Sequence, residues 1–255
     1  MTKTQYEEFS RLREEFRRNV QAWSGNASWL LPLQRELAAR LGYGDYEVET
    51  PVVYNKALDD VGPEASPAFL IVADNPGKNE QRKENQRYLV GQSGRLAQGW
   101  FSRELGVDFR SAAVVINKTP LHTPKTAELR LLRTIAAERS PAALEGLDAL
   151  LEESQKAMAE LAFRLHACLG GVLWVSGYGE LRKGKLFHTW AGTAKALYGP
   201  APQAMRRNLW VFKHFSMNQF SMEYNRARES SSPRETALDT LARIGSRWRS
   251  EILDL

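Results

Sequence analysis

The sequence contains a single cysteine, Cys168, and only four histidines. One cysteine excludes a disulfide within the chain, and it also excludes a zinc or iron–sulfur site built from four cysteines. The histidines are too scattered to show a metal-ligand spacing; they are His122, His166, His188 and His214. We therefore expect no metal ion and no other cofactor.

Long apolar runs are also absent, since none approaches the roughly 20 residues that a membrane-spanning helix requires. The first residues, MTKTQYEEFSRLREEFRR, are charged where a secretory signal peptide would be apolar. We expect a soluble, cytoplasmic protein with no membrane partner. With 43% hydrophobic residues among 255, the chain can bury a full core, most simply as one domain spanning residues 1–255.

Hydrophobic patterns along the chain alternate between those of strands and those of helices. Apolar runs predict strands at 68–73, 111–120, 170–179 and 207–216. Helical spacing predicts helices at 4–22, at 27–41, at 91–105, at 126–168 with a break near Ser140-Pro141, within 189–198, and at 233–252. This alternation predicts a three-layer α/β/α fold with a central, mainly parallel four-stranded sheet. Residues 1–60 would add an N-terminal helical extension, and residues 126–168 a helical insertion.

The residues that follow each strand are the first candidates for a site, because ligands of such sheets bind beyond the carboxyl ends of the strands. The four segments are Asp74-Asn75-Pro76-Gly77, Asn117-Lys118-Thr119, Ser176-Gly177-Tyr178-Gly179 and His214-Phe215-Ser216. All of them carry polar side chains or glycine. We expect the site at this edge of the sheet.

The net charge of +5 favours a polyanionic partner, because clustered lysines and arginines gain affinity for nucleic acid by releasing counterions from its phosphates. Two basic groups follow strand ends: Lys78, Arg82, Lys83 and Arg95 after the first, and Arg182, Lys183 and Lys185 after the third. An ordinary solvated helix face would carry the same residue types. The position of both groups beside strand ends favours contact with DNA.

Three of the strand ends resemble, in the same order, the motifs of the uracil-DNA glycosylase superfamily. Its members carry G-x-[ND]-P-[GY] after the first core strand, an Asn that ends a later strand, and [HN]-P-S after the last strand. This chain has ADNPG, VVIN and HFS, and it is also similar to the iron–sulfur-containing families in Glu80 and in YLVGQSGRL at 88–96. The resemblance covers roughly residues 65–230. The cluster cysteines are missing, and Phe215 stands where the family has proline.

The resemblance implies a monofunctional enzyme that flips a base out of DNA and hydrolyses its N-glycosidic bond with water. Asn75 matches the family's water-positioning residue, and an amide would orient water by hydrogen bonding because it is no strong base. Asp74 is the second candidate, since consecutive residues that leave a strand point in opposite directions. His214 would donate a hydrogen bond to the base oxygen that gains negative charge. The amide of Asn117 suits the edge of a uracil-like pyrimidine.

Gly77 stands where the strictest uracil enzymes of the family place a tyrosine that blocks substituents at C5 of the pyrimidine. With Pro76 and Gly77 in its wall, the pocket would accept uracil, mismatched thymine or a bulkier modified pyrimidine. Such an enzyme would act in base-excision repair or in defence against invading DNA with modified bases. Tyr88 or Leu89 falls at the position of the base-stacking residue, and we favour Tyr88 because it offers a ring.

Further DNA contacts are expected beyond the third and fourth strands. Ser176 and Ser216 are candidates for contact with the backbone, Ser216 with a phosphate. Met217 and Phe220 are candidate wedges that would fill the gap left by the flipped base. The DNA would be duplex or single-stranded and would contain the target base, and the sequence identifies no protein partner.

Two other interpretations remain open. A basic protein of the same fold could bind DNA without cutting it. Residues 179–186, GELRKGKL, nearly match the phosphate-binding loop G-x-x-x-x-G-K-[ST] of nucleotide-binding enzymes. Leu186 offers no hydroxyl for Mg²⁺, and the strand NLWVFKH that follows offers no acid, so this alternative is the weaker one.

Overall fold

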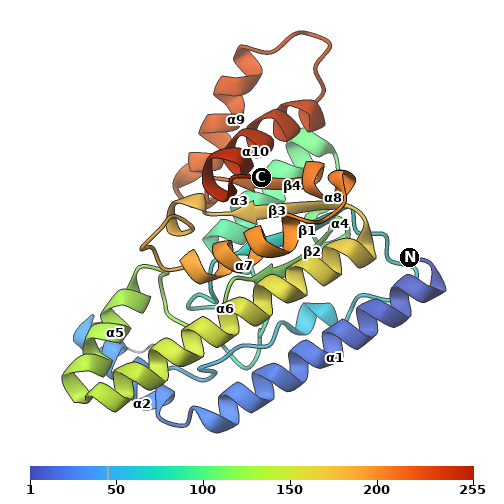
Figure 1. Cartoon of the computed structure of the whole chain (residues 1–255). Helices are drawn as coiled ribbons and strands as arrows, with labels where there is room; N and C mark the ends of the chain where they lie inside the picture. Colours follow the sequence, from blue (N-terminus) through green and yellow to red (C-terminus); the bar gives the residue numbers. More distant parts are fainter. Residues whose placement is uncertain (45) are drawn as a thin grey trace.

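The computed structural model describes residues 1–44 and 46–255, without the side chain of Met217. Its centre is a sheet of four parallel strands in the order β2-β1-β3-β4 (Figure 1). The strands are β1 (Phe69–Ala73), β2 (Ala113–Asn117), β3 (Val172–Ser176) and β4 (Leu209–Phe212). Each strand falls within its predicted range. Because helices cover both faces, the predicted three-layer α/β fold with additional N-terminal helices is confirmed.

The helices largely follow the predicted ranges. The α-helices are α1 (Lys3–Asn26), α2 (Leu30–Arg40), α3 (Gln92–Trp100), α4 (Phe109–Ala112), α5 (Glu128–Arg139), α6 (Pro141–Leu169), α7 (His188–Tyr198), α8 (Gln203–Arg207), α9 (Gln219–Glu229) and α10 (Ala237–Leu253). Shorter turns are η1 (Lys56–Leu58), the π-helical η2 (Phe101–Leu105), η3 (Tyr178–Glu180) and η4 (Ser216–Asn218).

The strands are apolar except for the last residues of β2 and β3, Asn117 and Ser176, because the sheet is covered on both faces. Every residue of β1, which reads FLIVA, is buried. β1 pairs in parallel with β2 and with β3, so that Ala73 lies opposite Asn117 and Val72 lies opposite Val175. This register brings the residues that follow the strands to one edge of the sheet.

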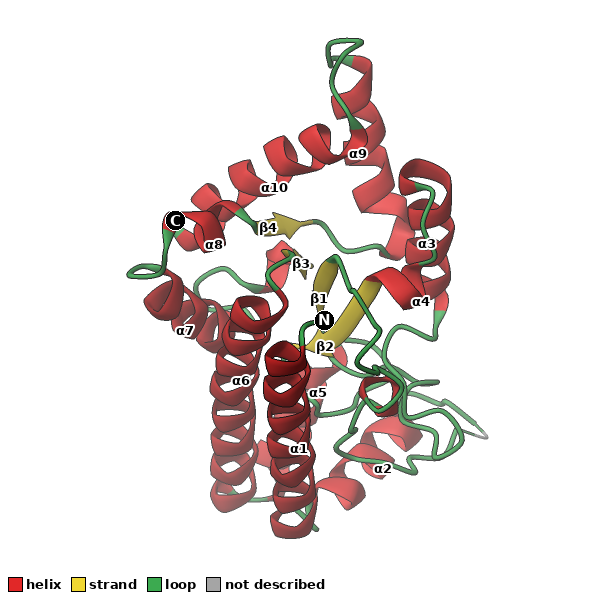
Figure 2. Ribbon diagram, turned by 90° about the vertical axis from the view of Figure 1, so that its right-hand side faces the viewer, coloured by secondary structure: helices red, strands yellow, loops and turns green. Residues whose placement is uncertain are grey.

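The longest helix, α6, covers one face of the sheet and carries α1 alongside it (Figure 2). On the other face, Trp100 and Phe101 pack against Trp174 of β3, with ring centroids 5.9 and 5.6 Å apart. Helix α10 packs on β4, the edge strand. The sheet is therefore held rigidly from three sides, which positions its carboxyl edge.

The predicted break near Ser140-Pro141 is the start of α6. The hydroxyl of Ser140 accepts a hydrogen bond from the N–H of Ala143 at 3.1 Å, and Pro141 lies in the first turn. Serine at the N-cap and proline just after it are the preferred residues at these positions. The helical stretch predicted at 126–168 is therefore two helices, α5 and α6.

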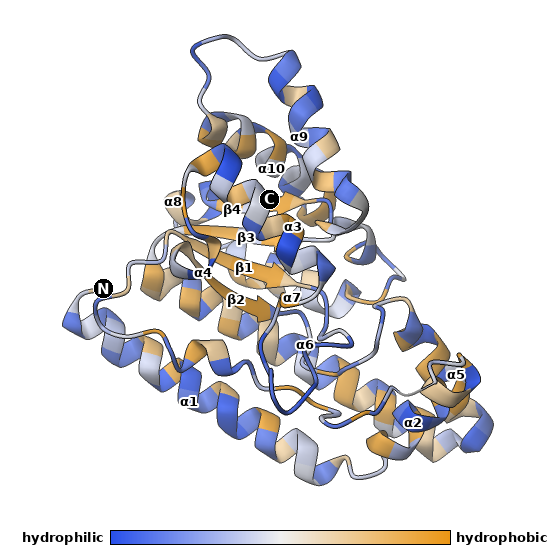
Figure 3. Ribbon diagram, turned by 180° about the vertical axis from the view of Figure 1, so that it is seen from behind, coloured by the Kyte–Doolittle hydropathy of each residue, from blue (hydrophilic) through white to orange (hydrophobic). Residues whose placement is uncertain are grey.

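Helix α9 was not predicted from the sequence. It projects from the body beside α10, and it is mostly hydrophilic (Figure 3). Only Phe220 and Tyr224 are buried along it, so its apolar pattern is too short to indicate a helix. None of the described helices is long and apolar enough to cross a membrane.

Candidate active site

A cavity of about 220 Å³ lies at the carboxyl edge of the sheet, among the segments that follow β1, β3 and β4. Its lining includes Asp74 after β1, Gly177 and Tyr178 after β3, and Lys213 and His214 after β4. These residues come from three separate parts of the sequence. The parallel sheet brings them together, as the position of ligands in such folds predicts.

The carboxylate of Asp74 is paired with a buried lysine. Nζ of Lys118 lies 2.5 Å from Oδ1 of Asp74 and donates a second hydrogen bond to the carbonyl of Ser176 at 2.5 Å. Lys118 is fully buried and Asp74 is 8% exposed. Burial lowers the pKa of Lys118, and the Asp74 carboxylate opposes that shift. The pair fixes Asp74 in the cavity wall. No motif in the sequence indicates this role for Lys118.

His214 is oriented by the turn that follows it. The backbone N–H of Ser216 donates to Nδ1 of His214 at 3.0 Å, and the hydroxyl of Ser216 lies 2.7 Å from the same nitrogen. A ring nitrogen that accepts a hydrogen bond carries no proton, so the neutral ring has its proton on Nε2. Burial lowers the pKa of His214, which favours this neutral form. The ring therefore offers an N–H donor to a ligand through Nε2.

Asn75 leaves the strand on another side from Asp74. Its amide nitrogen donates to Oγ1 of Thr123 at 2.9 Å and to the carbonyl of Leu121 at 3.2 Å. Its Oδ1 is buried and has no hydrogen-bond partner among the described residues. Because both hydrogen bonds use the nitrogen, the oxygen is the group left free to accept a hydrogen bond from a ligand or a water molecule.

Asn117, the last residue of β2, is 1% exposed. Neither its Oδ1 nor its Nδ2 has a hydrogen-bond partner in the part of the chain that the structure describes. Unsatisfied buried amides are costly, so such a group in a folded protein needs an explanation. A ligand edge that offers both a donor and an acceptor would satisfy it.

The Asp74–Gly77 turn is supported by residues that sequence analysis did not assign to the site. The carbonyl of the buried Pro76 accepts a hydrogen bond from Nδ1 of His122 at 2.8 Å, while Nε2 of His122 bonds to the hydroxyl of Tyr46. Burial lowers the pKa of His122 to about 4, so the ring is neutral and can donate from Nδ1 while accepting at Nε2. On the other side, Glu80 accepts the N–H of Gly77 at 3.1 Å.

Glu80 provides a test of this support through pH. Burial raises the pKa of Glu80 from 4.5 to about 7, against backbone hydrogen bonds from Gly77 and Leu89. The folded state therefore binds this proton more tightly than the unfolded state, so the contribution of Glu80 to stability is full below about pH 4.5 and is lost as the pH rises through about 7. We expect the stability of Glu80→Gln relative to the parent to increase by about 2 kcal/mol when the pH is raised from 5 to 8.

Urea unfolding of both proteins at the two pH values measures this difference. Glu84→Gln, a change at an exposed position of the same loop, is the matched control and should alter stability equally at both pH values. A pH-independent effect of Glu80→Gln would contradict the assignment.

Two glycines at the site have different roles. Gly177 has φ +82°, and a Cβ built on it would lie 2.6 Å from Oδ1 of Asp74, so only glycine lets the carboxylate occupy its place. A Cβ built on Gly77 would have the carbonyl of Pro124 as its nearest neighbour, at 3.7 Å. A side chain at position 77 would therefore make only an ordinary van der Waals contact, so crowding does not require glycine there.

The prediction that Tyr88 stacks on a base is wrong for this structure. Tyr88 is fully buried, and its hydroxyl donates to the carbonyl of Val53 at 2.5 Å, so its ring belongs to the core. Leu89, the other candidate, is 4% exposed and has φ +53°. Arg110 donates to the carbonyls of both residues and holds this conformation. Leu89 is therefore buried as well, and neither residue of the pair lines the cavity.

Two of the predicted DNA contacts are also wrong, because their side chains are in the core. Phe220 is fully buried and packs against Trp100 and Trp174, with ring centroids 4.9 Å apart in both cases. Ser176 is fully buried too. The side chain of Met217, the other predicted wedge, lies outside the described part of the chain. Met222 on α9 is an exposed apolar side chain of the same segment, at 59%, but it does not line the cavity.

Phe215, which replaces the family's proline, is explained by packing. It is 3% exposed and stacks on Trp174 with ring centroids 5.5 Å apart. Ser216, the predicted phosphate contact, orients His214 in this structure.

The predicted basic groups are on the surface. The exposed residues are Lys78, Arg82, Lys83 and Arg95 of the first group and Arg182, Lys183 and Lys185 of the second. Lys78 lies over the rings of Tyr43 and Tyr46, at 5.8 and 5.1 Å. Arg182 pairs with Glu251 at 3.2 Å. Their accessibility agrees with a role in binding DNA, which stays a prediction.

The near-match to a phosphate-binding loop is occupied by an acidic side chain. Oε2 of Glu180 accepts hydrogen bonds from the N–H of Leu186 at 3.3 Å and from Arg130 at 2.5 Å. A carboxylate in that place would repel a phosphate, and its hydrogen bond takes up an N–H that a phosphate would need. This geometry disfavours nucleotide binding at 179–186.

The fold and the site define a three-layer α/β protein with a polar cavity at the carboxyl edge of a parallel sheet. Within the described ranges, no three His, Cys, Asp or Glu side chains cluster as metal ligands. Compared with protein-family models and with curated proteins, the chain gives no match. The chemistry of the cavity therefore carries the functional argument.

Proposed function

We propose that the chain is a DNA glycosylase that hydrolyses the N-glycosidic bond of uracil or of a 5-substituted pyrimidine. The observation that carries this proposal is the cavity in which the carboxylate of Asp74 and the N–H donor of His214 line the same space. Hydrolysis of this bond builds positive charge on the sugar and negative charge on the departing base. A carboxylate can stabilise the positive charge on the sugar, and a neutral N–H donor can stabilise the negative charge on the base.

Asp74 and Asn75 share the task of preparing the water in this mechanism. The Asp74 carboxylate, compensated by Lys118, stabilises the positive sugar and accepts the proton that the water loses. Asn75 is not among the residues that line the cavity, but its unpartnered Oδ1 could accept a hydrogen bond from the water and orient it. Nε2 of His214 donates to the base oxygen that becomes negative. The geometry therefore favours Asp74, the second candidate from sequence, as the stronger base.

We assign recognition of the base to Asn117 and Gly77, which neighbour the cavity in sequence but are not among the residues that line it. The unpartnered amide of Asn117 matches a pyrimidine edge with one donor and one acceptor. The absence of a side chain at Gly77 supports a substrate with a substituent at C5, so we include mismatched thymine and modified pyrimidines. The enzyme would act in the cytoplasm, in base-excision repair or in defence against DNA with modified bases.

The test is incubation with duplexes that carry uracil, mismatched thymine or 5-hydroxymethylcytosine, scored by alkaline cleavage at abasic sites. We expect Asp74→Asn to lower turnover by about 10²–10⁴-fold, which is the usual contribution of a positioned base. Asn75→Ala should lower it by about tenfold, since it removes one hydrogen bond.

Lys3→Gln is the control, because Lys3 is exposed on α1 and lies outside the cavity. Circular dichroism would verify the fold of each variant, since Asp74→Asn leaves Lys118 without its carboxylate. Full activity in both site variants would overturn the mechanism. Base content unchanged by the parent on every duplex would favour a DNA-binding protein without enzymatic activity.

A further inference from the structure

A second and larger groove, of about 750 Å³, lies between α9 and α10. Of the described residues that line it, four carry a positive charge and one, Glu223, carries a negative charge. The four cations are Lys213, Arg226, Arg243 and Arg247. An excess of positive charge in a groove selects for an anionic ligand.

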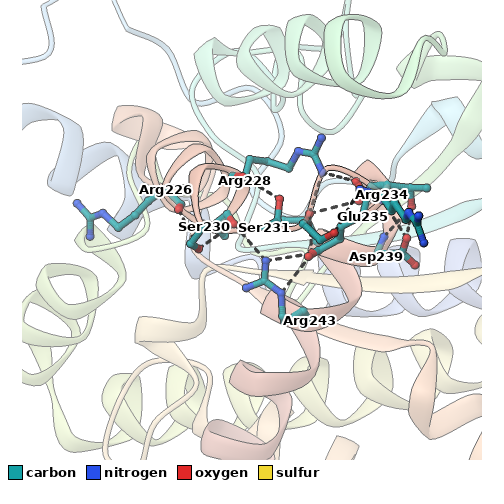
Figure 4. A network of polar contacts seen from close by, with 12 residues as sticks. Arg226, Arg228, Ser230, Ser231, Arg234, Glu235, Asp239 and Arg243 are labelled. Atoms are coloured by element: carbon teal, nitrogen blue, oxygen red, sulfur yellow. Dashed lines mark hydrogen bonds and ion pairs between the residues drawn. The ribbon is translucent and has the colours of Figure 1, made fainter.

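The walls of this groove are held in place by a polar network between the end of α9 and the start of α10 (Figure 4). Arg243 donates to Glu235 at 3.0 Å and to the carbonyl of Ala227 at 3.1 Å. Arg228 donates to the carbonyl of Glu235 at 2.5 Å. These bonds fix α9 against α10, so the groove is present before a ligand binds.

Two of the four cations are free to meet a ligand. Arg243 and Arg247 have carboxylate partners, Glu235 and Glu223. In the part of the chain that the structure describes, Lys213 and Arg226 form no ion pair, although both line the groove. Unpaired cations in a groove can neutralise phosphates and thereby release counterions from the nucleic acid.

The groove adjoins the cavity that Asp74 lines. Lys213 and Gln219 line both spaces. Tyr178, in the cavity wall, stacks on Trp248 of α10 with ring centroids 4.0 Å apart. A chain molecule with one unit in the cavity could therefore extend its neighbouring units along α9 and α10.

We propose that the α9–α10 groove binds the phosphate backbone of the DNA strand next to the nucleotide held in the cavity, an inference that rests on the proposed function. Lys213 and Arg226 contact phosphates directly, and Arg243 and Arg247 maintain the positive potential. An acidic protein segment would meet the same charges but would have no unit suited to the adjoining cavity.

The test compares two double variants that remove the same charge. Lys213→Gln with Arg226→Gln alters the groove, and Lys3→Gln with Arg18→Gln alters exposed positions on α1. Fluorescence anisotropy would measure binding of an undamaged duplex between 50 and 200 mM salt. We expect the groove variant to bind at least about tenfold more weakly at low salt, and its slope of log K against log salt to fall by about 2. The α1 variant should bind like the parent.

Several outcomes would overturn the groove assignment. Equal losses in both double variants would indicate a net-charge effect, and unchanged binding in the groove variant would exclude phosphate contact there. If polyglutamate bound the parent as tightly as DNA does, and if the groove variant lost affinity for both equally, the partner would be an acidic protein. Both variants should keep the melting temperature of the parent, because the altered side chains are on the surface.

The outcome is separable from that of the base-release assay, because the duplex contains no target base. If the groove variant binds DNA more weakly but the parent releases no base, the groove assignment stands and the glycosylase proposal is refuted. If the parent releases base but the groove variant binds DNA as the parent does, the glycosylase proposal stands and the groove assignment is refuted.

Discussion

Replacing Lys118 with methionine is expected to lower the free energy of unfolding by about 3–5 kcal/mol, which is the usual cost of removing one partner of a buried ion pair. Lys118 is fully buried, and its ammonium forms a 2.5 Å contact with Asp74. Methionine fills the same space but leaves the Asp74 carboxylate buried without its compensating charge. Urea unfolding at neutral pH measures the effect.

Lys156→Met is the matched control for this prediction. Lys156 also forms a 2.5 Å ion pair, with Glu152, but both side chains are more than half exposed. Such a pair contributes about 0–1 kcal/mol, so its loss should be small. Equal costs at the two positions would show that burial of the Lys118 pair has no energetic consequence.

The double variant Lys118→Met with Asp74→Asn separates the lost charge from the lost packing. Removing both charges leaves no buried ion, so we expect the double variant to be more stable than the sum of the two single effects predicts. A coupling energy near zero would mean that the two residues do not act as a pair. The stability measurement does not depend on the proposed function.

The second large effect concerns His214 and the proposed activity. We expect His214→Ala to lower kcat by about 10²–10³-fold with little change in KM, because the donor would act on charge that develops only in the transition state. His188→Ala is the control, since His188 is exposed and lies outside the cavity. It should stay within about twofold of the parent.

The pH dependence of the activity distinguishes this role from a structural one. Burial lowers the pKa of His214, the Asp74 carboxylate opposes the shift, and the Lys118 ammonium adds to it. The neutral ring, with Nδ1 accepting from Ser216, should therefore persist to a lower pH than an ordinary histidine allows. We expect the acid limb of the pH–rate profile to lie below the ordinary histidine range, and a limb at or above pH 6.5 would contradict the assignment.

Most of the fold could be predicted from local patterns. The strand FLIVA and the cap at Ser140-Pro141 are specified by neighbouring residues, through β-branched apolar side chains and through helix-capping chemistry. Helix α9 could not be predicted, since it contributes only Phe220 and Tyr224 to the core. Its stability comes from packing against α3, β3 and α10, which no window of sequence contains.

The candidate site was predicted in part. Asp74, Asn75, Asn117 and His214 were found because polar residues after apolar strands are conspicuous. The roles of Tyr88 and Phe220 were wrong, because whether a ring faces a ligand or the core depends on which segments cover it. Lys118 was missed because lysine is normally exposed, and its partner Asp74 is brought to it only by strand pairing.

The sequence by itself determined the strands, most helices and the polar character of the strand ends, since these follow from the periodicity and chemistry of adjacent residues. The tertiary structure alone decided the Asp74–Lys118 pair, the burial of His214 and the groove between α9 and α10. These depend on distances between residues far apart in the chain and on the burial that removes water from them. Both properties exist only once the sheet and its helices have assembled.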